Sequence, residues 1–108
     1  MQYESLGVFG RLHNRTRSAM ILDFMIENKQ DSYSISEIVK FTGISHKTVF
    51  EVIHNFLVLG IIKSIRKVGH IHLYQYNIES EVGKLLDRVS LQIANVEIDL
   101  ELQKQKKL

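Results

Sequence analysis

The chain has 108 residues, of which 44% are hydrophobic and 24% charged, and its net charge is only +2. This composition is typical of one folded domain and excludes general disorder. The absence of cysteine excludes disulfides, thiolate metal sites and a cysteine nucleophile, and the absence of proline allows long uninterrupted helices. Because no signal peptide or long apolar run is apparent, we expect a cytoplasmic protein.

An amphipathic helix is predicted near the start of the chain, over residues 17–29. Ile21, Leu22 and Met25 recur there at the spacing that places them on one helix face. The polar stretch that follows ends this helix, and residues 33–35 beyond it are short and prone to β structure.

A second and a third helix follow, separated by a glycine. We expect Ser36 to cap the second helix, because Glu37 then lies in its first turn, where the helix dipole favours a carboxylate. Gly43 ends that helix. Ser45 then caps a third helix over residues 46–59, whose apolar residues recur on one face.

Two β-prone runs come next, residues 61–68 and 70–77, and Gly69 joins them. Two such runs around one glycine predict a β-hairpin. One long helix is then expected over residues 80–105, because Gly83 is the only helix breaker in that segment. The chain is therefore predicted to be mainly α with a small β-hairpin, an α+β fold.

The apolar residues of the predicted long helix form an uninterrupted seam. They are spaced alternately by four and three residues, which is the heptad pattern of a coiled coil. The seam could fold back on its own domain, but on so small a domain it would leave a large apolar strip exposed. We therefore expect a homodimer through this helix. The expected interface residues are Val82, Leu86, Val89, Ile93, Val96 and Leu100.

Charge is unevenly distributed along the chain. Residues 40–78 hold five basic groups and a single acid, Glu51, whereas residues 79–103 hold two basic groups and six acids. The middle of the chain therefore attracts polyanions, and the segment 79–103 does not.

In this order and spacing, the elements resemble the winged helix-turn-helix domain of archaeal and bacterial transcription regulators of the ArsR/MarR-like kind. The matching motifs are Arg17 with Ile21-Leu22, residues 34–38, residues 42–45, Thr48-Val49, residues 59–62, and a basic hairpin around Gly69 that ends in Tyr74-Gln75-Tyr76. The resemblance implies a winged domain at 17–78, an N-terminal extension at 1–16, and a dimerisation helix with a basic tail at 79–108. It implies sequence-specific binding to double-stranded DNA as a transcriptional regulator.

The resemblance also implies which residues contact DNA. The helix 46–59 corresponds to the recognition helix, which enters the major groove, and the hairpin corresponds to the wing, which contacts phosphates or the adjacent minor groove. The implied contact residues are Ser45, His46, Lys47, Thr48, Phe50 and Glu51 on the helix, Lys63, Arg66, Lys67 and His70 on the hairpin, and Arg15 and Arg17 near the N-terminus.

Two parts of this assignment stay open. Many relatives carry small polar and basic residues at the positions of Phe50 and Glu51. Here these residues either contact a thymine methyl group and a cytosine, or are a partly buried core residue and a solvated one. Residues 3–16 either pack beside the long helix or present Arg11, Arg15 and Arg17 to phosphates.

Other kinds of site have little support. The chain has five histidines, but it has no cysteine and no histidine after residue 72, so we expect no metal site and no cofactor. No phosphate-binding loop or hydrolase motif occurs, and we expect no catalytic residue, no small-molecule ligand and no contact with a membrane. Two alternatives to a regulator remain: a winged-helix module that binds other proteins, and an architectural or segregation protein that coats DNA.

Overall fold

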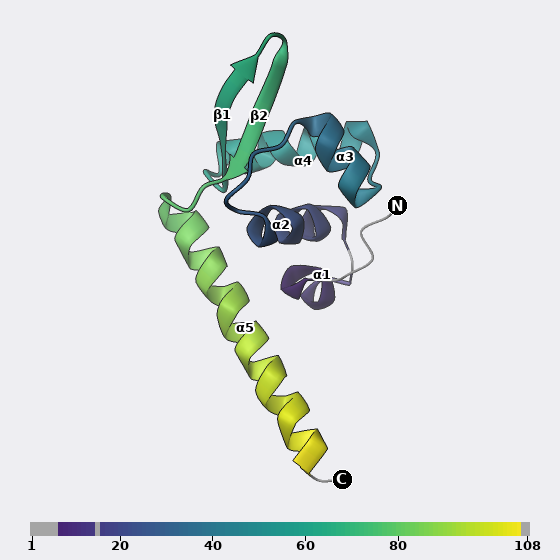
Figure 1. The fold of residues 1–108 in the computed structure, drawn as a ribbon, viewed down its shortest axis with the longest axis vertical. Helices are drawn as coiled ribbons and strands as arrows, with labels where there is room; N and C mark the ends of the chain where they lie inside the picture. Colours follow the sequence, from purple (N-terminus) through teal and green to yellow (C-terminus); the bar gives the residue numbers. More distant parts are fainter. Residues whose placement is uncertain (1–6, 15, 107–108) are drawn as a thin grey trace.

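The computed structural model describes residues 7–14 and 16–106. The elements in chain order are α1 (Val8–Leu12), α2 (Arg17–Glu27), α3 (Ile35–Thr42), α4 (His46–Val58), β1 (Ile62–Val68), β2 (Ile71–Tyr76) and α5 (Glu81–Lys106). The prediction of a mainly helical α+β chain with one hairpin and a long last helix is confirmed (Figure 1).

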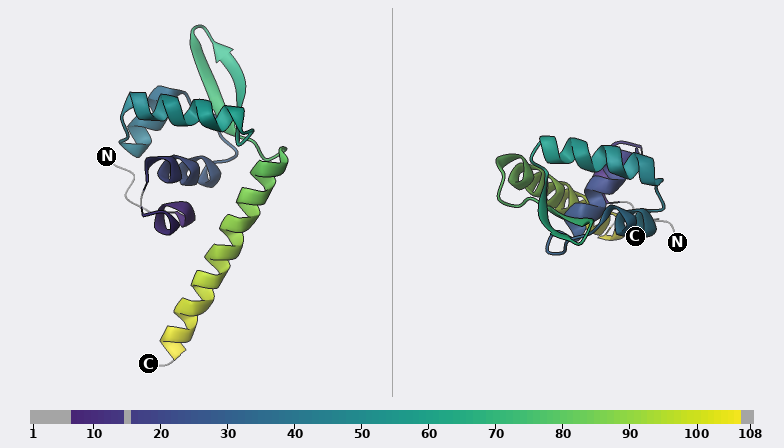
Figure 2. Two further views of the ribbon diagram at one scale, coloured as in Figure 1. Left: turned by 180° about the vertical axis from the view of Figure 1, so that it is seen from behind. Right: turned by 90° about the horizontal axis from the view of Figure 1, so that it is seen from above.

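Helices α2, α3 and α4 form a helical body, from which the hairpin β1–β2 and helix α5 project in different directions (Figures 1 and 2). The apolar faces of the three helices meet in one core, to which the base of the hairpin contributes. Its fully buried residues include Ile21, Met25, Ile38, Val49, Ile53, Ile62 and Tyr76. The helical spacing of these residues explains why the three helices pack as they do.

The start of α3 differs from the expectation. Its N-cap is Ser34 and not Ser36, because Ser34 and Glu37 form a reciprocal pair. The Ser34 hydroxyl accepts the Glu37 N–H at 3.2 Å, and the Glu37 carboxylate accepts the Ser34 N–H at 2.9 Å. This capping box requires the carboxylate three residues after the cap, which only Ser34 satisfies. Gly43 ends the helix as predicted, with a left-handed φ of 73°.

The two strands pair antiparallel, and their register shifts between Ser64 and Arg66, where Ile65 forms a bulge. Val68 lies opposite Ile71 on either side of the turn, in which Gly69 has a φ of 62°. Such a φ costs glycine nothing, and this explains why the hairpin turns at this residue.

The predicted β-prone segment 33–35 does not form a strand. Tyr33 alone joins the sheet, through two backbone hydrogen bonds of 2.8 Å with Tyr74. The next residue already caps α3, so the chain turns away from the sheet after a single bridge.

Helix α1 packs into the core through Phe9, which is only 5% exposed. The carboxylate of Asp23 on α2 accepts the backbone N–H groups of Phe9 at 2.8 Å and Gly10 at 2.6 Å, and so satisfies the start of α1. Burial raises the pKa of Asp23, and the two N–H donors oppose that rise. Asp23 therefore attaches the N-terminal helix to α2.

We expect Asp23→Ala to lower the free energy of unfolding by about 3 kcal/mol, because two buried N–H groups would lose their acceptor. Chemical denaturation at fixed protein concentration measures this loss. Asp99→Ala, at an exposed position on α5, is the control and should change stability by no more than about 0.5 kcal/mol. Equal stabilities of the two variants would show that α1 does not depend on Asp23.

The start of helix α5 is joined to the hairpin and the helical body by a closely packed, hydrogen-bonded junction. The Tyr76 hydroxyl donates to the carbonyl oxygen of Gly83 at 2.6 Å. The Ser80 hydroxyl accepts the Gly83 N–H at 2.9 Å and donates to the Gly60 carbonyl at 2.7 Å. A Cβ atom at Gly83 would overlap the carbonyl oxygen of Asn77. Burial raises the pKa of Tyr76 to about 12, so this hydroxyl stays protonated and keeps donating.

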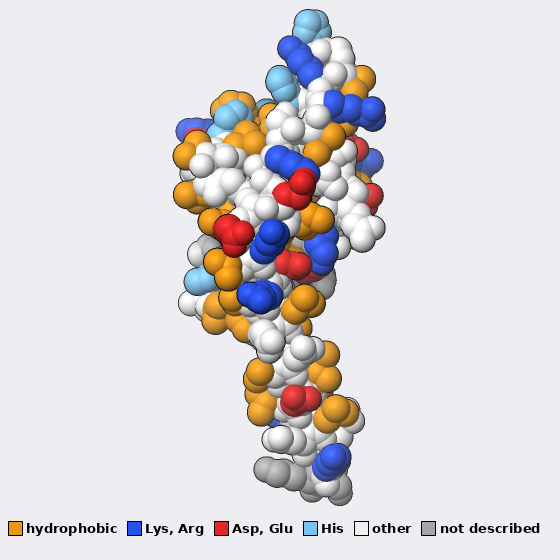
Figure 3. All heavy atoms as spheres, turned by 90° about the vertical axis from the view of Figure 1, so that its left-hand side faces the viewer, with side chains coloured by type: hydrophobic (Ala, Val, Ile, Leu, Met, Phe, Trp, Pro, Cys, Tyr) orange, Lys and Arg blue, Asp and Glu red, His pale blue; other side chains and the backbone are white. Residues whose placement is uncertain are grey.

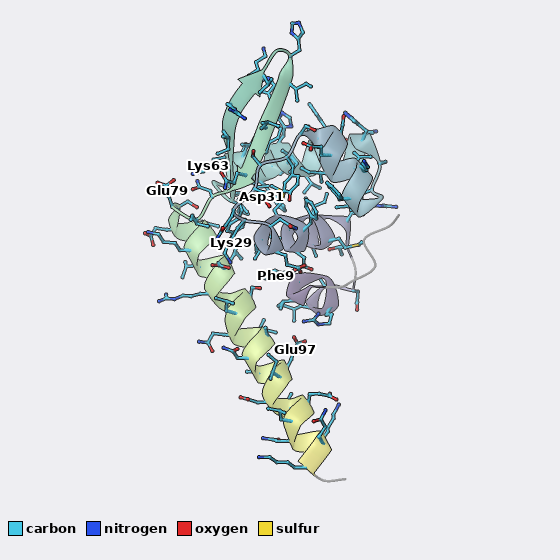
Figure 4. All side chains as sticks on the ribbon, viewed as in Figure 1. Phe9, Lys29, Asp31, Lys63, Glu79 and Glu97 are labelled. Atoms are coloured by element: carbon cyan, nitrogen blue, oxygen red, sulfur yellow. The ribbon has the colours of Figure 1, made fainter. Side chains whose placement is uncertain are left out.

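Two ion pairs hold α5 beside the body. Lys29 lies 3.3 Å from Asp87, and the Arg11 guanidinium donates to Glu97 at 3.0 Å; Lys29 and Glu97 are marked in Figure 4. Beyond Glu97 the side chains of α5 are exposed, and the molecule measures 57 Å along its longest axis. None of the described helices is both long and apolar enough to cross a membrane.

Candidate nucleic-acid interface

The start of α4 and the hairpin line a common hollow of about 310 Å³. Side chains from three elements meet there, although they come from separate parts of the sequence. The lining residues are Ser34, Ile35 and Ser36 at the start of α3, His46 and Phe50 on α4, and His70, Ile71, His72 and Tyr74 on the hairpin. Of the predicted contact residues, His46, Phe50 and His70 therefore line one hollow.

The first turns of α4 present the predicted residues in two ways. The Ser45 hydroxyl accepts the Thr48 N–H at 3.3 Å and donates to the Thr48 hydroxyl at 3.0 Å, so this pair caps the helix. His46, Lys47 and Glu51 are exposed. The cap therefore orients the helix start, and the residues around it are free to reach a ligand.

Phe50 is a surface residue and not a partly buried core residue. It is 47% exposed, and its ring lies 4.1 Å from the ring of His54, one turn further along α4. Its apolar ring therefore faces outward beside Glu51, which is also exposed.

The hairpin presents Arg66, Lys67 and His70 as exposed side chains near its tip, where Lys, Arg and His side chains gather in Figure 3. Lys63 lies instead at the base of the hairpin and donates to Glu79 at 2.7 Å, and both residues are labelled in Figure 4. The four predicted wing residues thus divide into three at the tip and one in an ion pair. The Lys63 ammonium lowers the pKa of Glu79.

Lys63→Met should raise the pKa of Glu79 toward the ordinary glutamate value, because the lysine's hydrogen bond and charge both favour the ionised form. A pH titration of the Glu79 side chain by NMR measures the change. The carboxylate's contribution to stability is present above its unfolded pKa and is lost as the pH falls through the lowered folded value. An identical titration in both proteins would rule out a lasting ion pair in solution.

Three of the cations predicted to contact DNA have no acidic partner among the described residues. Across residues 7–14 and 16–106, the salt bridges use Arg11, Lys29, Lys63 and Lys84, and none uses Lys47, Arg66 or Lys67. No acidic residue occurs in the sequence between Glu51 and Glu79. The surface formed by α4 and the hairpin is therefore positively charged near the tip and can attract an anionic ligand.

Of the two N-terminal arginines predicted to contact DNA, the structure describes Arg17 only. Arg17 is exposed at the first position of α2. Arg15 lies outside the described residues.

The six seam residues of α5 do not share one environment. Leu86 packs against the core and Ile93 is half-buried, whereas the other four are exposed. A second apolar stripe runs along the other side of the helix, and the protruding half of α5 shows hydrophobic side chains along both edges in Figure 3. The exposed seam residues are Val82, Val89, Val96 and Leu100, and the second stripe consists of Leu91, Ile98 and Leu102.

His72 was not among the predicted contact residues, although it lines the same hollow as His70. Its alternation with His70 along the strand is the sequence signal that could have identified it. No group of three or more His, Asp or Glu side chains that could hold a metal ion occurs in the described part of the chain.

Helices α2, α3 and α4, followed by the hairpin, define a winged helix-turn-helix fold. No family model matches the sequence, and no curated protein does. Among solved structures the chain is similar to ZitR of Lactococcus lactis, a double mutant in its apo form. The TM-score is 0.63 and the identity 13%, over 94% of this chain and 74% of that one.

The chain is also similar to the ferric uptake regulator of Francisella tularensis, whose structure is described with iron. The TM-score is 0.51 and the identity 20%, over 59% of this chain and 52% of that one. The chain thus spans about half the length of the ferric uptake regulator. At these identities, both likenesses establish a shared fold.

Proposed function

We propose that this chain is a homodimeric, sequence-specific double-stranded DNA-binding protein that regulates transcription and has no enzymatic activity. The observation that carries the proposal is that α4 and the hairpin line a common hollow, and that Lys47, Arg66 and Lys67 on these two elements have no acidic partner among the described residues. One structural neighbour is named the ferric uptake regulator, and this name supports a role in regulation for the present chain. The resemblance to ArsR/MarR-like proteins supports the same role.

In the proposed complex, α4 enters the major groove, which is wide enough for a helix. Lys47 contacts a phosphate or guanine, while Phe50 and Glu51 meet base edges. Arg66 and Lys67 contact phosphates beside the groove, where each neutralised phosphate releases counterions. His46 and His70, which line the common hollow, add hydrogen-bond donors.

The proposed dimer uses the exposed seam of α5. Val82, Val89 and Val96 recur every seven residues along one side of α5 and are exposed in the single chain. Pairing this stripe with that of a second copy removes it from water, and twofold symmetry then places two recognition helices about 34 Å apart, one turn of DNA. Leu86, which packs against the chain's own core, and the half-buried Ile93 would flank such an interface.

Replacing Val89 and Val96 by aspartate should make the chain a monomer, because four charges would then face one another across the interface. Light scattering measures the mass in solution. Gln92→Asp with Asn95→Asp is the matched control, because it adds the same charge at exposed polar positions of the same helix. If the two double variants have the same mass in solution, α5 does not form the dimer interface.

Selection of bound sequences from random duplex DNA tests the function. We expect one enriched motif with twofold symmetry and half-sites about 10 base pairs apart. Because the ferric uptake regulator is described with iron, binding is measured with and without a metal chelator, and we expect affinities within about twofold of each other. Binding without any enriched motif would favour a DNA-coating protein, and no binding with a copurifying second chain would favour a protein-binding module.

A further inference from the structure

The tip of the hairpin carries an exposed apolar pair. Val68 and Ile71 face each other across the turn, and they are 53% and 56% exposed. Ile65 at the bulge is 40% exposed, so three aliphatic side chains of this projecting hairpin face solvent. A wing that only held phosphates would need cations and no such pair.

The charges around the pair favour a polyanion as its partner. Arg66 lies two residues before Val68 on the same face of the strand, and Lys67 and His70 adjoin the pair in sequence. The whole segment between Glu51 and Glu79 lacks acids. An apolar pair beside cations that have no acidic partner among residues 7–14 and 16–106 is suited to a surface that combines phosphates with flat apolar groups, and nucleic acid offers both.

We propose that Val68 and Ile71 form a wedge that enters the minor groove, inserts between two base pairs and kinks the duplex. This inference rests on the proposed function and adds to it how the DNA is deformed. The minor groove is about 6 Å wide and too narrow for a helix, but proteins that bind there insert single apolar side chains between base steps. Gly69 adds no side chain to the turn, and its positive φ keeps the turn tight.

The wedge is stable because both side chains leave water for the space between unstacked bases, while Arg66 and Lys67 hold the flanking phosphates. Pyrimidine–purine steps such as TA unstack most easily, so they are the expected insertion points. The tip would therefore select sequence through the flexibility of the DNA, in addition to any base contacts from α4.

The probe is a duplex of about 30 base pairs that contains the motif enriched by the selection together with TA steps, and it carries a donor and an acceptor fluorophore at its two ends. Wild-type protein should bring the ends closer and raise energy transfer. Val68→Thr with Ile71→Thr should abolish this change, weaken binding about three- to tenfold, and leave the salt dependence unaltered, since every cation that neutralises a phosphate is still present. Threonine keeps the β-branched shape that favours strands, so the hairpin should still form.

Val58→Thr with Ile78→Thr is the matched control, because it replaces the same residue types at exposed positions away from the tip. This control should bend DNA like the wild type. The wedge would be overturned if the wild-type protein left the DNA unbent, or if the tip variant bent it equally. Salt-dependent binding to the duplex would in either case still support the proposed function. Absence of any binding to the duplex would overturn both. Loss of binding to phosphatidylserine vesicles by the tip variant, with DNA bending unchanged, would assign the tip to a membrane surface and overturn the wedge.

Discussion

Replacing Lys47, Arg66 and Lys67 together by glutamine is expected to weaken DNA binding at least about a hundredfold near physiological salt. Each of these cations is exposed and has no acidic partner within the described residues, so each is available to a phosphate. The slope of log affinity against log salt should flatten by about 0.9 for each phosphate that is no longer neutralised, or about three units per chain. Fluorescence anisotropy at several salt concentrations measures both quantities.

The matched control removes three exposed cations from α5, at Lys84, Arg88 and Lys104. Both variants change the net charge equally, but charges far from the DNA are screened beyond about 8 Å at physiological salt. The α5 variant should therefore bind within about threefold of the wild type. An equal loss in the two variants would mean that affinity follows net charge, and it would contradict the assignment of α4 and the hairpin as the DNA-binding surface.

Gly83→Ala is expected to lower the free energy of unfolding by about 3 kcal/mol and the melting temperature by about 10–20 °C. The added methyl group would overlap the carbonyl oxygen of Asn77 and lie 2.9 Å from the Ser80 hydroxyl. Because the first of these is a backbone atom, the methyl group can be accommodated only if α5 moves away from the hairpin. That movement also lengthens the hydrogen bond from Tyr76 to the Gly83 carbonyl.

Gly69→Ala is the control for this substitution. It makes the same chemical change where no atom lies within 4 Å of the new methyl group, so only the strain of a positive φ remains, about 1 kcal/mol. Thermal melts of both variants are compared at one protein concentration, since melting of a dimer depends on concentration. If Gly83→Ala melts no lower than Gly69→Ala, the junction between the body and α5 is not closely packed in solution.

The local elements could be predicted because their signals lie within a few residues of each other. Ser45 caps α4, Gly43 ends α3, and Gly69 makes the hairpin turn, and each does so through its own backbone preference or a bond to a near neighbour. The misplaced cap of α3 also had a local signal, the Ser34–Glu37 spacing of a capping box. Both Ser34 and Ser36 are suitable caps by residue type, and only the reciprocal bond with Glu37 distinguishes them.

Within the candidate interface, the helix and the hairpin could be predicted from the sequence. The ion pairing and the exposure of their side chains could not. Lys63 and Arg66 are both cations of one strand, yet Lys63 pairs with Glu79 while Arg66 is exposed. The orientation of Phe50 was equally undecided, since an aromatic residue on an amphipathic helix suits either the core edge or the surface. Which one occurs depends on how far the hairpin and α3 cover that part of α4.

The long helix α5 and its apolar seam could be predicted from the sequence, because a spacing that alternates between four and three residues is a property of one helix. The packing of the elements shows in addition that Leu86 lies against the chain's own core while Val89 and Val96 remain exposed. The same packing brings Asp23 to the start of α1 and the Tyr76 hydroxyl to the Gly83 carbonyl. Periodicity and caps act within a turn or two of chain, whereas burial and pairing between distant residues exist only once the elements have packed.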